Sequence, residues 1–271
     1  MGETLAAIAG WRRDAPRRAE EVAREWGLRL GAQYAPGVAG HVVRAVCEDG
    51  TAAVLKLVWP HREAEQEADA LERWDGAGAV RLLARDDERH ALLLERCEPG
   101  TTLSRAPDPL GVLVGLLPRL WVDSDGFRSL AEEAEHWLVG PDLAAVPDRR
   151  LREAATHHLR ELGPSQGEQV LVHQDLHGDN VLAAQREPWL AIDPKPLSGE
   201  REFALAPIVR SSELGHSKRD VLYRLDRLTA ELGLDRDRAR GWAIAQTVAW
   251  MGGSDVIESH VETVRWLLEE A

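Results

Sequence analysis

Residues 171–196 read LVHQDLHGDNVLAAQREPWLAIDPKP. The polar residues of this stretch first alternate along the chain and are then spaced more widely: His173, Asp175, His177, Asp179, Asn180 and Asp193. Carboxylates, imidazoles and an amide packed this densely among apolar residues are costly unless they bind a ligand or one another. The stretch therefore predicts a chemical site.

Phosphoryl transfer from a nucleotide suits this set of side chains. The reaction needs divalent metal ions that bridge the phosphates and a carboxylate that orients the attacking hydroxyl. Mg²⁺ prefers oxygen ligands and takes only one or two of them from protein. Asp175, Asn180 and Asp193 supply two carboxylates and an amide oxygen. The apolar runs VLAA and PWLAI flank a turn at residues 185–188, so we expect a hairpin that brings Asn180 and Asp193 together.

The rest of the chain predicts an α+β protein with two lobes. Residues 28–58 and 79–97 contain β-branched and apolar runs broken by turn residues, which is typical of a small antiparallel sheet. Periodicity and capping residues predict helices at residues 14–26, 61–74, 127–139, 148–162, 217–232, 235–251 and 254–269, another that begins at Asp108-Pro109, and N-caps at Ser217 and Ser254. The break at Glu98-Pro99-Gly100 predicts lobes of residues 1–98 and 99–271.

Lys56 and the helix that follows it carry a second polar signal. The chain has only three lysines, and Lys56 lies between leucines in an expected strand. It either reaches into a site or is a lysine whose charged end extends to solvent from the strand end. Glu63 and Glu67 share an expected helix face with a leucine and a tryptophan. A carboxylate pair on such a face is either part of a solvated helix surface or not an ordinary solvated edge.

Composition excludes several classes of function. The 271 residues are 44% hydrophobic and 29% charged, which is typical of a soluble globular protein. A net charge of −13 argues against nucleic acid as a partner and suits a cationic small molecule. The two cysteines, Cys47 and Cys97, form neither a disulfide framework nor a zinc motif, so a cytoplasmic location is expected. The longest apolar runs are too short to cross a membrane, and the N-terminus does not resemble a signal peptide.

The quoted stretch resembles a known family. Its Asp-x-x-x-x-Asn spacing with a later Asp resembles the catalytic and metal-binding loops of kinase-fold enzymes. HQDLHGDN is similar to the HGDLHxxN loop of the aminoglycoside phosphotransferase family, and IDP at 192–194 takes the place of the protein-kinase DFG. NVLAAQREPWLAIDPKPL, WDGAGAVRLL at 74–83 and LLLERCEPG at 92–100 resemble the streptomycin 6-kinase and hydroxyurea kinase branch. The resemblance covers most of the chain and implies a protein-kinase-like fold, with a small N-terminal sheet lobe for the nucleotide and a larger, mainly helical lobe for catalysis.

The resemblance also implies roles for individual residues of the catalytic segment. Asp175 would accept or orient the acceptor hydroxyl, and Asn180 and Asp193 would hold Mg²⁺. His173 would brace the loop. Lys195 either contacts phosphate or lies on the surface.

Further roles are implied for the nucleotide lobe. Lys56 would bind the α and β phosphates of ATP or GTP, with Glu67, or else Glu63, steering its ammonium group. Backbone groups of the linker from Glu95 to Cys97 would bind the purine edge, and the turn at residues 37–40 would cover the phosphates.

One position departs from the family pattern. Relatives are expected to carry an aspartate after the phenylalanine of REFALAP, where it ties down the catalytic loop, but this chain has Ala204. Either Glu200 or Glu202 substitutes for that acid, or the following helix begins differently.

The predicted function is that of a small-molecule O-phosphotransferase. It would move the γ-phosphate of ATP or GTP to a hydroxyl of an antibiotic, with streptomycin-like aminoglycoside resistance as the leading specific reading. Residues 200–271 hold 13 acidic and 10 basic residues, which is too small an excess of acid to indicate a pocket for a highly cationic acceptor. A capuramycin-type nucleoside, a viomycin-like peptide or hydroxyurea therefore stays open as acceptor. The expected partners are nucleotide and antibiotic, without nucleic acid or membrane, on a monomer or homodimer.

Two other classes of protein compete with this interpretation. Alternate residues of an extended segment share a face, so the histidines and aspartates of residues 173–179 could ligate zinc in a metallohydrolase. That reading leaves Lys56, Asn180 and Asp193 without a role. A pseudokinase is the other alternative, although all the expected polar groups are present.

Overall fold

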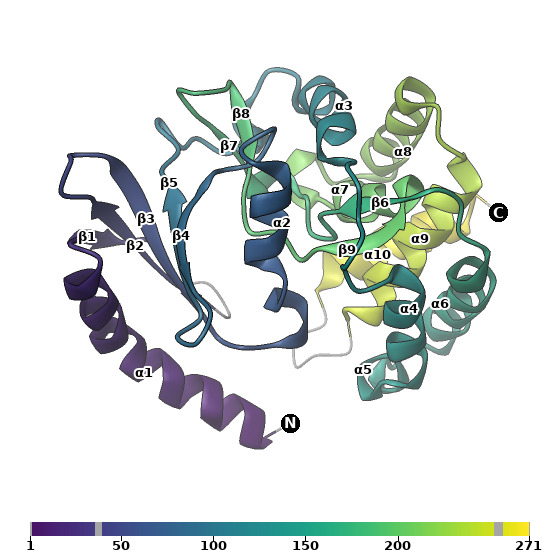
Figure 1. The fold of residues 1–271 in the computed structure, drawn as a ribbon. Coiled ribbons are helices and arrows are strands. Elements are labelled where there is room, and N and C mark those ends of the chain that lie inside the picture. Colours follow the sequence, from purple (N-terminus) through teal and green to yellow (C-terminus); the bar gives the residue numbers. More distant parts are fainter. Residues whose placement is uncertain (1, 36–39, 252–256, 271) are drawn as a thin grey trace. The chain divides into compact units, whose positions relative to one another are not determined.

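The computed structural model describes residues 2–35, 40–251 and 257–270, which form two units. The first unit contains residues 1–100 and 183–190, and the second contains residues 101–182 and 191–271. The short return of the chain at 183–190 places the tip of the expected hairpin in the first unit. Figure 1 shows the elements of both units. Among the helices of the described ranges, none combines the length and apolar character that crossing a bilayer requires.

A five-stranded antiparallel sheet forms the centre of the first unit. Its strands are β1 (Arg29–Gln33), β2 (Gly40–Val46), β3 (Ala52–Val58), β4 (Leu82–Asp86) and β5 (Ala91–Glu95), in the spatial order β1-β2-β3-β5-β4. Lys56 lies on the central strand β3, opposite Val42 on one side and Leu92 on the other. A central strand is held by hydrogen bonds along both edges, so the position of Lys56 is fixed by the sheet.

Helix α1 (Gly2–Glu25) packs on one face of this sheet (Figure 1). Its buried residues Trp11, Ala15, Ala19 and Val22 recur at helical spacing and pack with alternate residues of β3, Leu55 and Leu57 among them. The prediction that a helix begins at Asp14 was wrong, because α1 continues through Pro16. The apolar stripe extends to both sides of the proline, and its burial outweighs the backbone hydrogen bond that proline cannot donate.

The face of β3 opposite α1 carries Lys56, and the segment that follows β3 supplies its partner Glu67. Helix α2 (Glu67–Trp74) is shorter than the predicted helix over 61–74, since residues Arg62–Ala64 form a separate 3₁₀ turn. Glu63 therefore lies outside α2, whereas Glu67 is its first residue and is 2% exposed. Side chains alternate across a strand, so Lys56 points away from the α1 face on which Leu55 and Leu57 are buried.

The second unit is mainly helical. Its helices are α3 (Pro109–Leu120), α4 (Leu130–Val139), α5 (Pro141–Ala145), α6 (Arg149–Leu162), α7 (Ala206–Val209), α8 (Lys218–Leu232), α9 (Arg236–Ala249) and α10 (Glu258–Leu268). Asp108 and Ser217 cap α3 and α8 as predicted, because each side-chain oxygen accepts a backbone N–H of the first turn. Helix α10 begins later than expected, with Ile257 as its N-cap, and Ser254 lies outside the described residues.

Two short antiparallel pairs of strands support the quoted segment. Strand β6 (Gln169–Val172) pairs with β9 (Leu197–Glu200), and β7 (Val181–Ala183) pairs with β8 (Trp189–Ala191). The amide of Lys195 donates to the carbonyl of His173 at 3.0 Å, just beyond the β6–β9 pair. The loop after β6 and the segment before β9 thus lie side by side, which gathers the polar residues of both.

Candidate active site

Asp175 lies in the loop between β6 and β7 and is 8% exposed. Both of its carboxylate oxygens accept hydrogen bonds from cations of the same unit. Lys195 Nζ lies 2.7 Å from Oδ2, and Arg210 Nη2 lies 3.3 Å from Oδ1. The carboxyl group of Asp175 is therefore held in a defined orientation, and Lys195 is engaged with it rather than free on the surface.

The two cations share a common support. Lys195 Nζ lies 4.9 Å and Arg210 Cζ lies 4.5 Å from the centroid of the Trp250 ring. Both distances are within the range in which an aromatic face attracts a cation. Trp250, Lys195 and Arg210 thus form a cationic wall beside Asp175. The sequence offered no signal for Arg210 or Trp250, because they follow the loop by 35 residues or more.

His173 is almost fully buried beneath the loop. Its Nδ1 accepts the backbone N–H of Asp175 at 3.3 Å, so Nε2 carries the proton and donates it to the carbonyl of Ile192 at 2.9 Å. Burial lowers the pKa of His173 to about 4, so the imidazole is neutral near pH 7. These contacts are what a residue that braces the loop requires.

Asn180 and Asp193 lie at the two ends of the hairpin. The Asn180 carbonyl accepts the N–H of Ile192 at 2.9 Å, so its backbone lies beside the neighbour of Asp193. The side-chain Nδ2 of Asn180 donates to the carbonyl of Asp175 at 2.9 Å. Because the nitrogen end is used in this way, the oxygen end of the amide is the end left to face a cation. Asp193 has a left-handed backbone with φ of 57°.

In the first unit, Lys56 and Glu67 form a buried ion pair. Lys56 Nζ lies 2.5 Å from Glu67 Oε1, and the two side chains are 9% and 3% exposed. Of the two acids considered from the sequence, the structure brings Glu67 to the lysine. Residues 36–39, where the phosphate-covering turn was expected, lie outside the described residues, and Gly40 is the first residue of β2.

The linker after β5 is fixed by Glu95. Its carboxylate accepts the amide of Arg81 at 3.0 Å and Arg186 Nε at 2.9 Å. The Glu95 amide donates to the carbonyl of Arg81, so this N–H already has a partner within the sheet. Burial raises the pKa of Cys97 to about 12, which keeps the thiol neutral and unreactive. Neither Cys47 nor Cys97 forms a disulfide.

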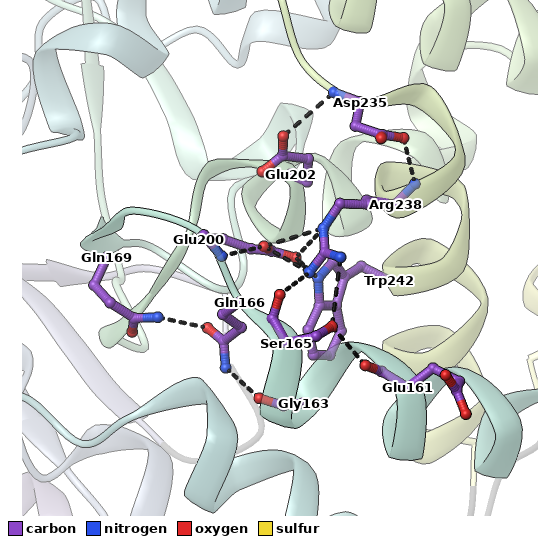
Figure 2. A network of polar contacts seen from close by, with 11 residues as sticks. Glu161, Gly163, Ser165, Gln166, Gln169, Glu200, Glu202, Asp235, Arg238 and Trp242 are labelled. Atoms are coloured by element: carbon purple, nitrogen blue, oxygen red, sulfur yellow. Dashed lines mark hydrogen bonds and ion pairs between the residues drawn. The ribbon is translucent and has the colours of Figure 1, made fainter.

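The two acids near Ala204 are engaged away from the loop. Figure 2 shows the carboxylate of Glu200 facing Arg238 and Trp242 of α9, and it also accepts the amide of Gly167 at 3.0 Å. Glu202 accepts the amide of Asp235 at 3.3 Å. Their described contacts tie β9 and the following turn to α9, and Ala204 itself is 3% exposed.

His177 and Asp179 lie with Glu213 rather than with His173. Their ligand atoms and a Glu213 carboxylate oxygen are all within 4.8 Å of one another. Burial lowers the pKa of His177, but the hydrogen bond to Glu213 and the negative charges of Asp175 and Glu213 together outweigh burial and raise that pKa above its ordinary value. The alternating residues do not share one face, because Gly178–Asn180 forms a 3₁₀ turn. The alternating set of four residues on which the zinc hydrolase interpretation depended is therefore not brought together as one ligand set.

Known proteins identify the family of this chain. The family model described as aminoglycoside/hydroxyurea antibiotic resistance kinase matches residues 25–253. The chain belongs to this family. Two relatives of the antibiotic resistance kinase have named activities. A hydroxyurea phosphotransferase of Kitasatospora aureofaciens is 42% identical over 86% of this chain and 71% of the relative. A streptomycin 6-kinase of Streptomyces griseus is 41% identical over 82% of this chain and 76% of the relative.

Solved structures confirm the predicted kinase-like fold of this antibiotic resistance kinase. A choline kinase from Streptococcus pneumoniae superposes with a TM-score of 0.66 at 14% identity, covering 95% of this chain and 98% of that chain. An aminoglycoside phosphotransferase in complex with ADP and hygromycin B gives 0.65 at 13% identity, covering 93% and 95%. The prediction of an antibiotic phosphotransferase is confirmed by the family match and by the two named relatives.

Proposed function

We propose that this antibiotic kinase transfers the γ-phosphate of ATP or GTP to a hydroxyl of an aminoglycoside, with streptomycin as the leading acceptor. The observation that carries the proposal is the carboxylate of Asp175, held by two cations in a loop that matches the family motif. In a loose transition state the hydroxyl proton leaves late, so Asp175 acts chiefly by accepting and orienting that hydroxyl.

Groups of the first unit would bind the donor nucleotide. Lys56, steered by Glu67, would pair with the α and β phosphates, and the linker from Glu95 to Cys97 would contact the purine. The oxygen end of Asn180 and the Asp193 carboxylate suit Mg²⁺, which when bound neutralises charge on the phosphates. His173 would keep the loop in place. A cytoplasmic location follows from the need for nucleotide and suits the two free cysteines.

Hydroxyurea is a second candidate acceptor. The relative at 42% identity is a hydroxyurea phosphotransferase, and the wall of Lys195 and Arg210 places positive charge beside Asp175. A small neutral hydroxyl compound approaches such a wall without the repulsion that a guanidinium group meets. A streptomycin molecule would have to direct its guanidinium groups away from this wall.

A phosphorylation screen tests the proposal. Purified protein is incubated with Mg²⁺ and either ATP or GTP, and with streptomycin, hydroxyurea, a capuramycin-type nucleoside or viomycin in parallel. Mass spectrometry should find one added phosphoryl group on streptomycin, or on hydroxyurea if the second candidate is right. Nucleotide hydrolysis without phosphorylation of any acceptor would contradict the proposal.

A further inference from the structure

The catalytic loop needs a support that the expected acid does not provide. Gln174, directly before Asp175, has a left-handed backbone with φ of 65° and is fully buried. A non-glycine residue holds this conformation only where its surroundings impose it. Ala204 has no carboxylate, and the described contacts of Glu200 and Glu202 are made elsewhere. The constraint on Gln174 must come from another element.

That element is helix α9. Gln246 of α9 is fully buried, and its Nε2 donates to the backbone carbonyl of Gln174 at 2.8 Å. The side-chain amide of Gln174 itself has no hydrogen-bond partner among the described residues. The backbone carbonyl is therefore the part of Gln174 by which α9 holds the loop.

Arg210 completes the connection between α9 and the carboxylate. Its Nη1 donates to Gln246 Oε1 at 2.6 Å, and its Nη2 reaches Asp175 Oδ1 at 3.3 Å. Gln174, Gln246, Arg210 and Asp175 thus form a closed ring, in which Asp175 is joined to Gln174 by the chain itself. The Arg210 side chain is 7% exposed, so solvent screens these bonds weakly.

We propose that Arg210 and Gln246 are positioning residues that fix the carboxylate of Asp175 for transfer. The inference rests on the proposed role of Asp175. The ring requires these two side chains in particular. The guanidinium fork of Arg210 serves two acceptors at once, which a lysine does not reproduce. Gln246 uses one donor end and one acceptor end, which neither glutamate nor methionine offers.

The test compares the single variants Arg210→Lys, Gln246→Met and Asp175→Asn. It also uses double variants that combine Asp175→Asn with either Arg210→Lys or Gln246→Met. Each single ring variant should lower kcat by about 10- to 100-fold, because small misplacements of a catalytic group are costly, while KM for nucleotide stays near wild type. Single-turnover assays should show that Arg210→Lys in the Asp175→Asn background causes no further loss. That non-additivity is expected only if Arg210 acts through Asp175.

Arg238→Lys is the matched control. Arg238 also pairs with a buried carboxylate of the second unit, that of Glu200, but its described contacts do not include the loop (Figure 2). It should lower the melting temperature and leave kcat unchanged. Wild-type kcat in Arg210→Lys and Gln246→Met, or losses that multiply with Asp175→Asn, would overturn the inference. Full turnover by Asp175→Asn alone would instead overturn the proposed function.

Discussion

At the residue scale, the ion pair of Lys56 and Glu67 shows how burial turns a simple contact into a constraint. Both side chains are more than nine-tenths buried, so the ion pair offsets part of the cost of removing each charge from water. A pair of this kind adds little net stability over a hydrophobic pair. The pair holds an ammonium group at a fixed point of β3, which the proposed role of Lys56 in phosphate binding requires.

Lys56→Met tests this interpretation. The single variant leaves the Glu67 carboxylate buried without its described cation, and unfolding in urea should show a loss of about 3–5 kcal/mol. The double variant Lys56→Met/Glu67→Met should regain most of that stability while nucleotide binding, measured by calorimetry, stays lost. A double variant that binds nucleotide like wild type would refute the role given to Lys56.

At the scale of elements, the hairpin tip at residues 183–190 belongs to the first unit because of Arg186. Its guanidinium donates to the Glu95 carboxylate and to the carbonyls of Gly76 and Ala79 at 2.7 and 3.0 Å. The same tip separates Asn180 from Asp193 in the sequence. Arg186 thus connects the segment that carries the predicted metal ligands with the linker predicted to bind the purine.

Arg186→Lys should release the tip. A lysine cannot make all the hydrogen bonds of the planar Arg186 guanidinium, so some of its acceptors on Glu95, Gly76 and Ala79 lose their partner. The free energy of unfolding should fall by about 1–3 kcal/mol. Hydrogen exchange should become faster at residues 183–190. Arg149→Lys is the comparison variant, since Arg149 pairs with Glu153 on an exposed face of α6 and such pairs contribute little. Equal exchange at the tip in both variants would count against this role of Arg186.

Elements were predicted from the sequence where local signals were strong. β-Branched and apolar runs broken by turn residues predicted the strands of the first unit, and capping residues predicted the starts of α3 and α8. The hairpin after Asn180 also formed as expected. The start of α1 was missed because a proline is an ambiguous signal inside a long apolar stripe. The ring of Arg210 and Gln246 could not be predicted, because tertiary packing alone brings α9 to the loop.

At the scale of the molecule, one buried and two half-buried histidines contribute to how the second unit responds to acid. Burial lowers the pKa values of His158, His173 and His260 to about 4, from an ordinary value of 6.5. The unfolded chain therefore takes up protons below pH 6.5 that the folded unit does not bind until about pH 4. Stability is fully present above the unfolded pKa and is lost as the pH falls through this window.

Urea unfolding over this range measures the effect. The free energy of unfolding should fall by up to about 1.4 kcal/mol per pH unit for each such histidine as the pH drops below 6.5. His173→Gln should make the dependence shallower, whereas His136→Gln, at an exposed position of α4, should leave it unchanged. Stability that does not change across this window would show that these histidines are not buried in their neutral form.

The proposed phosphate transfer depends most on Asp175 as the group that receives the acceptor hydroxyl. A comparison of two variants tests this role of Asp175 directly. Phosphate transfer to the acceptor found in the screen is measured for Asp175→Asn and for Asp179→Asn, an exposed acid of the same loop. Asp175→Asn should lose about 10²- to 10⁴-fold in kcat and still bind nucleotide, while Asp179→Asn keeps most of its turnover. Equal turnover in wild type and Asp175→Asn would contradict the account.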